Sequence, residues 1–151
     1  MLDYATLDAI ADSYNPLLLL LSLLYIGAAY FKGHWKMGGR RAVGFAVVVL
    51  VAYGLMFADK RYGLWEGLGL DYSTHTATSI GMVLFLSYFT SKLSVSVGLG
   101  ASFILYAGLM LYQRYHSFLD ILTTGVIVVL LLCGAVMVWR GLQMPARNQI
   151  R

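Results

Sequence analysis

Five long apolar runs, separated by short polar breaks, constrain this chain more than any other feature. They cover about residues 16–31, 42–58, 76–89, 93–112 and 121–139, of which the third is the shortest. A helix needs roughly 20 mostly apolar residues, within a range of about 17–25, to cross a bilayer. The chain is 60% hydrophobic and 12% charged, whereas soluble domains average about 45–50% and about 25%. We therefore predict an all-α, polytopic membrane helix bundle with about five transmembrane helices.

The segments outside these runs are too short for a second folded unit, so we predict a single transmembrane domain over residues 1–151. It begins with a short acidic segment, residues 1–15, and ends in a basic tail, residues 140–151. The acidic segment lacks the basic start of a signal peptide, so we expect the first run to be retained. We expect a short surface helix there, and Asn15 and Pro16 predict the start of the first span. The single Cys133 excludes a disulfide within one chain.

The distribution of Lys and Arg predicts which side of the membrane each connection faces, because these residues are retained on the cytoplasmic side. An N-terminus outside and a C-terminus in the cytoplasm give eight bases inside against three outside. The eight are Lys32, Lys36, Arg40, Arg41, Lys92, Arg140, Arg147 and Arg151, and the three are Lys60, Arg61 and Arg114. All seven acids then fall outside. We predict this orientation in a plasma or inner membrane.

Two of the three histidines lie in connections that this topology places on the same outer face. His75 ends the connection over residues 59–75, and His116 lies in the connection over residues 113–120. Ionisable groups at membrane depth are costly and usually functional. If a helix begins near His116, then Asp120 follows one turn later on the same face. That carboxylate can fix the imidazole tautomer of a nucleophilic histidine, and His75 can transfer a proton at the leaving group.

These residues also carry a resemblance to a known family. Tyr72-Ser-Thr-His-Thr-Ala resembles the Pro-Ser-Gly-His-Thr-Ala signature of the type 2 phosphatidic acid phosphatase superfamily. The stretch from His116 to Asp120 resembles the later signature of that superfamily, in which a His is followed four residues later by an Asp. The similarity to the sphingomyelin synthase branch, a group of lipid phosphotransferases, is closer still, because Asp71-Tyr72 precedes the first motif here as it does there. The resemblance covers about residues 69–130.

The resemblance implies a role for each matched residue. His116 is the nucleophile that forms a phosphohistidine, Asp120 orients it, His75 is the general acid, and Ser73 lies near the phosphoryl oxygens. The superfamily has an Arg six residues before the nucleophile, where this chain has Met110. Phosphoryl transfer depends on cations that neutralise developing charge. The outer cations that are left to bind the substrate are Arg114, Lys60 and Arg61.

The sequence therefore predicts an integral-membrane lipid phosphatase or lipid phosphotransferase that acts on an amphiphilic phosphate ester. We expect no cofactor, no metal and no nucleic acid, and a substrate whose tail stays in the bilayer. Association into a homo-oligomer is left open, because the families resembled have six spans. The alternative is a non-catalytic membrane protein, either a degenerate relative that binds lipid phosphates or a small subunit of a membrane complex. In that alternative, Asp120 pairs with Arg114 as a structural salt bridge.

Overall fold

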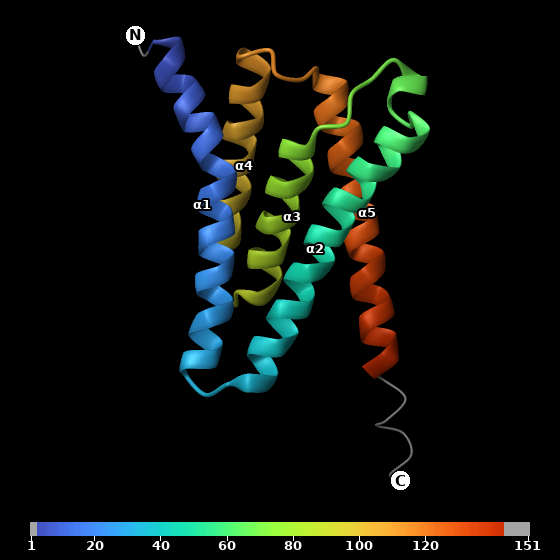
Figure 1. The fold of residues 1–151 in the computed structure, drawn as a ribbon. Helices are drawn as coiled ribbons and strands as arrows, with labels where there is room; N and C mark the ends of the chain where they lie inside the picture. Colours follow the sequence, from blue (N-terminus) through green and yellow to red (C-terminus); the bar gives the residue numbers. More distant parts are fainter. Residues whose placement is uncertain (1–2, 144–151) are drawn as a thin grey trace.

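The computed structural model describes residues 3–143, which form five α-helices and one short 3-10 helix (Figure 1). The elements are α1 (Tyr4–Phe31), α2 (Trp35–Tyr62), η1 (Glu66–Leu68), α3 (Thr74–Phe89), α4 (Leu93–Tyr112) and α5 (Phe118–Gln143). The prediction of an all-α bundle is confirmed. Each helix contains one of the five apolar runs, and α4 has the predicted bounds.

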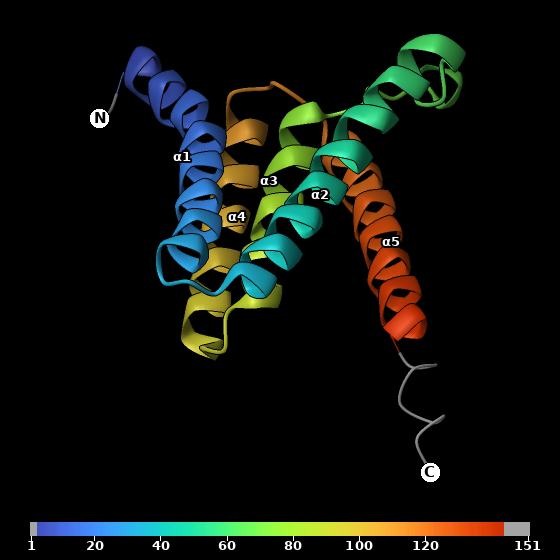
Figure 2. The same cartoon turned by 60° about the horizontal axis from the view of Figure 1, so that its bottom comes forward.

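Four helices, α1, α2, α4 and α5, are long and apolar enough to cross a membrane. This supports an integral membrane location. The remaining helix, α3, has 16 residues, slightly below the range of about 17–25 that a span requires. It occupies the centre of the bundle, where it packs against all four other helices (Figures 1 and 2). Its buried side chains include Ala77, Met82 and Phe85, so the shortest helix contributes much of the core.

The acidic N-terminal segment is not the separate surface helix that we predicted, because α1 continues from Tyr4 through Pro16 to Phe31. Asp3 caps its start by accepting a hydrogen bond of 2.9 Å from the N–H of Thr6. A proline inside a helix removes one backbone hydrogen bond. Packing of Ala11 in a buried cluster with Tyr106 and Met110 of α4 holds the segment before the proline against the bundle. These tertiary contacts explain why the helix begins at Tyr4 and not at Pro16.

The other helices also extend beyond some of the predicted spans, because charged side chains continue a helix readily past its apolar part. α2 begins at Trp35 rather than at residue 42 and ends at Tyr62 rather than at residue 58. It stops at Gly63, whose φ of 62° is left-handed, a conformation that glycine adopts without strain. α5 likewise covers more than the predicted 121–139. Residues 144–151 of the predicted basic tail lie outside the described residues.

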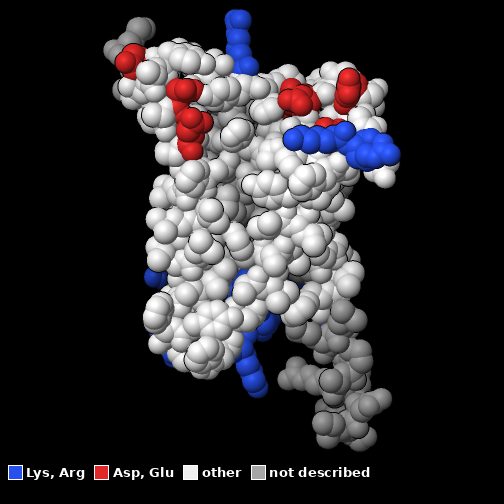
Figure 3. Space-filling model, viewed as in Figure 1, with Lys and Arg blue, Asp and Glu red and all other residues white. Residues whose placement is uncertain are grey.

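The helices alternate in direction, so the N-terminus and the connections before α3 and before α5 lie at the same end of the bundle (Figure 1). We call this the acidic end, because it carries all the described acids: Asp3, Asp8, Asp12, Asp59, Glu66, Asp71 and Asp120. Acidic side chains gather at this end in Figure 3, whereas much of the basic surface lies at the opposite end. The connections that carry His75 and His116 therefore lie at the same end of the bundle, as the sequence predicts.

Candidate functional site

The segment before α3 places His75 at the acidic end of the central helix. Ser73 caps α3 by accepting a hydrogen bond of 3.2 Å from the N–H of Thr76, and its own N–H donates to Thr124 Oγ1 of α5. Ser73 is fully buried, so its hydroxyl is a helix cap and does not face open space for phosphoryl oxygens. His75 is exposed and is the second residue of α3. Figure 1 shows that α3 begins below the upper ends of α1 and α4.

The Asp120 carboxylate, which the sequence analysis assigned to His116, makes its hydrogen bonds to the backbone of the two outer connections. Its Oδ2 accepts a hydrogen bond of 2.7 Å from the N–H of Ser117, and Ser117 Oγ accepts one of 3.2 Å from the N–H of Asp120. This reciprocal pair is a capping box at the start of α5. The other carboxylate oxygen, Oδ1, accepts a hydrogen bond of 2.8 Å from the N–H of Asp71. His116 precedes the helix, and no hydrogen bond or ion pair between His116 and Asp120 is found within residues 3–143, although the Asp120 charge still acts on the imidazole.

The capping role of Asp120 predicts a loss of stability on its removal. Asp120→Ala leaves the N–H groups of Asp71 and Ser117 without their acceptor, which should lower the free energy of unfolding by about 2–4 kcal/mol. Thermal unfolding in detergent measures this as a fall in Tm. The matched control is Asp12→Ala, because Asp12 is exposed on α1 and should change Tm little. Equal Tm values for the two variants would contradict the capping role.

The carboxylate nearest to His116 belongs to Asp71. His116 Nδ1 lies 3.5 Å from Asp71 Oδ2, and the two side chains are 12% and 74% exposed. The separation is too long for a good hydrogen bond, and Nδ1 has no hydrogen-bond partner among the described residues. No ion pair other than this one is found between side chains of residues 3–143, so Asp120 and Arg114 do not form the structural salt bridge of the alternative interpretation.

Burial lowers the pKa of His116 below the ordinary value of a histidine. The Asp71 and Asp120 carboxylates oppose this effect by stabilising the imidazolium, and the nearby His75 adds to the lowering. The net result favours a neutral imidazole at neutral pH, which is the form that can act as a nucleophile or a base.

Asp71→Asn should lower the pKa of His116 further, because the substitution removes a negative charge that stabilises the imidazolium. Since Asp71 is largely exposed, its charge is well screened by solvent and the expected decrease is small. NMR titration of the His116 ring measures it directly. Glu66→Gln is the matched control. It removes an exposed charge at the same end of the bundle and should leave the pKa of His116 unchanged. A rise in the His116 pKa in Asp71→Asn would show that the assigned contact is wrong.

The three cations predicted to bind substrate come from two different parts of the acidic end. Arg114, Lys60 and Arg61 are all exposed, and none takes part in an ion pair within residues 3–143. Lys60 and Arg61 lie in the last turn of α2, which extends away from α1 and α4 together with η1 in both views (Figures 1 and 2). Arg114 is closer to His116 along the chain and adopts a φ of 57°, unusual for a residue other than glycine.

Buried polar groups near the histidines were missed by sequence reasoning. Asn15 of α1 donates hydrogen bonds of 3.4 Å to the backbone carbonyl of His75 and to the hydroxyl of Tyr106. Gln113, at the end of α4, is 6% exposed, and both of its side-chain polar atoms lack a hydrogen-bond partner among the described residues. An amide inside or at the edge of an apolar run is the signal that could have identified them, because buried polar groups are costly unless paired.

The site residues of the chain thus form two groups. His116 lies beside Asp71 of the segment before α3, Asp120 ties that segment to α5, and His75 is the second residue of α3, whereas the cations lie at the end of α2 and just after α4. Within residues 3–143 no cluster of three or more His, Cys, Asp or Glu side chains could hold a metal ion. Comparison with protein-family models, curated proteins and solved structures finds no match to this chain.

Proposed function

We propose that this membrane protein is a lipid phosphatase or lipid phosphotransferase that works through a phosphohistidine at His116. The observation that carries the proposal is a largely buried histidine whose Nδ1 faces a carboxylate, at the same end of the bundle as a second histidine. His75 is among the groups that lower the pKa of His116, so it contributes to the electrostatic surroundings of that ring. Membrane-embedded surroundings favour an amphiphilic substrate.

In the first step, Nε2 of neutral His116 attacks the phosphorus of the ester. The bond between phosphorus and the alcohol oxygen breaks, its electron pair goes to that oxygen, and protonated His75 supplies the proton. The positive charge that develops on the imidazole is stabilised by Asp71, whose carboxylate lies 3.5 Å from Nδ1. Asp71 therefore takes the role that the sequence had given to Asp120.

In the second step, water or a lipid alcohol attacks the phosphohistidine. His75, now neutral, accepts the proton of the attacking hydroxyl, and the electrons of the bond between nitrogen and phosphorus return to His116. Attack by water gives a phosphatase and attack by a lipid alcohol gives a transferase.

The N-terminus of α3 is the best available partner for the phosphoryl oxygens. Among the described residues, no acceptor pairs with the N–H groups of Thr74 and His75, because Ser73 caps Thr76 instead. Free N–H groups at the positive end of a helix stabilise anions. They support the proposal because Met110, and not an Arg, stands six residues before His116.

The second candidate is a non-catalytic protein that binds lipid phosphates. It is favoured by the surface positions of Arg114, Lys60 and Arg61 and by Met110, which is 1% exposed where the superfamily has its Arg. Purified protein in phosphatidylcholine vesicles, offered phosphatidic acid and other lipid phosphates, separates the candidates. Release of inorganic phosphate indicates a phosphatase, a new phospholipid indicates a transferase, and saturable binding without turnover indicates the second candidate.

We also propose that the acidic end faces away from the cytoplasm, as the charge distribution favours. In a Cys133→Ser background, Gly67→Cys should react with an impermeant thiol reagent in intact cells, because position 67 in η1 has no neighbour within 4 Å of an added Cβ. His34→Cys, in the connection at the opposite end, should react only after permeabilisation. The reverse pattern would contradict the orientation while leaving the site geometry unchanged.

A further inference from the structure

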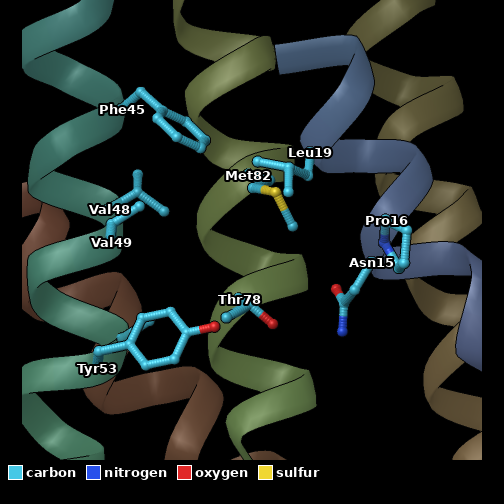
Figure 4. A pocket seen from close by; sticks show the side chains of 10 residues that line it. Asn15, Pro16, Leu19, Phe45, Val48, Val49, Tyr53, Thr78 and Met82 are labelled. Carbon is cyan, nitrogen blue, oxygen red and sulfur yellow. The ribbon is translucent and has the colours of Figure 1, made fainter. Parts of the chain in front are cut away.

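A groove runs along the bundle between α1, α2 and α3 (Figure 4). Its volume is about 280 Å³. It is lined by Asn15, Pro16, Leu19, Phe45, Val48, Val49, Ala52, Tyr53, Thr78 and Met82. Leu19 of α1 and Val49 of α2, on opposite walls, are 42% and 40% exposed. Since α1 and α2 are both long and apolar enough to cross a membrane, we expect the groove to open onto the hydrocarbon of the bilayer.

The groove is polar at one end and apolar at the other. Figure 4 shows Asn15, Tyr53 and Thr78 together at one end, with the Asn15 amide and the two hydroxyl groups turned toward one another. Leu19, Phe45 and Met82 lie toward the other end. Asn15 Oδ1 has no hydrogen-bond partner among the described residues. A ligand that matches this lining has a hydrocarbon chain and, at one end of it, a polar group such as an ester, which can accept a hydrogen bond from the Asn15 amide or the Tyr53 hydroxyl.

The polar end of the groove leads to His75. Thr78 and Met82 follow His75 by three and seven residues on α3, a spacing that places all three on one face of a helix. Asn15 also connects the groove with His75. It lines the groove and donates a hydrogen bond of 3.4 Å to the backbone carbonyl of His75.

We propose that this groove binds one hydrocarbon chain of a membrane lipid, with the polar end of that chain at Asn15, below His75. The volume is at the lower limit of small-molecule sites, which occupy about 300–1,000 Å³, so it accommodates one chain and not a whole two-chain lipid. The identification of this lipid with the phosphate ester that reacts at His116 rests on the proposed function. Binding of the chain itself does not.

The test uses a photoreactive phosphatidic acid that carries a diazirine midway along one acyl chain, incorporated in phosphatidylcholine vesicles with the full-length protein. Crosslinked residues are identified by mass spectrometry, and excess unlabelled phosphatidic acid serves as competitor. We expect competitor-sensitive crosslinks at groove residues such as Leu19, Phe45 and Met82. They should also form in His116→Ala, since binding does not need turnover.

Val49→Trp places a large ring in the groove and should reduce these crosslinks about tenfold. The matched control is Leu50→Trp, because Leu50 is the next residue on α2, is 73% exposed and does not line the groove. Leu19→Trp and Leu20→Trp form the same comparison on α1. Crosslinks that are spread over all lipid-facing residues, or that persist equally in Val49→Trp and Leu50→Trp, would overturn the proposal.

The two proposals fail in different ways. Saturable crosslinking in the groove with neither phosphate release nor a new phospholipid would support the groove and remove the proposed function. Phosphate release that is equally fast in Val49→Trp and in Leu50→Trp, at limiting substrate, would show that the reacting lipid does not use the groove.

Discussion

His116→Ala is expected to reduce phosphate release from phosphatidic acid by at least about 10³-fold. The substitution removes the atom that forms the covalent intermediate, and no other described histidine lies beside a carboxylate at ion-pair distance. Initial rates measured on purified protein in vesicles give the comparison. The groove crosslinks should be unchanged, which shows that the variant is folded and still binds lipid.

The control for this variant is His34→Ala. His34 is the third histidine of the chain and lies in the connection between α1 and α2, at the end of the bundle opposite to the site. Turnover in His34→Ala should equal that of the unaltered protein. Turnover that survives in His116→Ala would exclude the phosphohistidine mechanism, whatever the effect of other substitutions.

His75→Ala is expected to slow turnover of alkyl phosphate esters by about 10²–10⁴-fold, the usual contribution of general acid catalysis. An alkoxide is a poor leaving group and needs a proton from His75, whereas a nitrophenolate leaves without one. The loss should therefore be much smaller for a nitrophenyl phosphate ester with the same lipid chain. Comparison of kcat for the two esters in both proteins measures this difference. An equal loss for both esters would assign His75 to a different role.

The sequence was sufficient to predict the helices because bilayer-length apolar runs leave few other structures. The bounds of α4 agree with the prediction at both ends, since polar residues flank that run closely. The prediction for α1 was wrong at its start, because Pro16 reads as a helix start locally. The contact of Ala11 with Tyr106 and Met110, which holds the earlier turns in place, comes from a helix far along the chain.

The candidate site was predicted in part. The alternation of the helices brings the connections with His75 and His116 to one end, as the sequence indicates. The sequence analysis interpreted the spacing of Asp120 from His116 as a pair, whereas the structure places Asp120 in a capping box with Ser117. No local pattern predicts that Asp71 faces His116, because that contact depends on how the segment before α3 crosses α5.

Trapping of the covalent intermediate tests the central claim most directly. His75→Ala protein, in which the second step is also slowed, is mixed with a nitrophenyl ester of a lipid phosphate and quenched under alkaline conditions, which preserve phosphohistidine. Mass spectrometry of the digested protein then locates any phosphoryl group. The proposed mechanism predicts phosphorylation at His116 and none in the protein that carries both His75→Ala and His116→Ala. Substrate turnover with no phosphoryl group on His116, or with one on another residue, would contradict it.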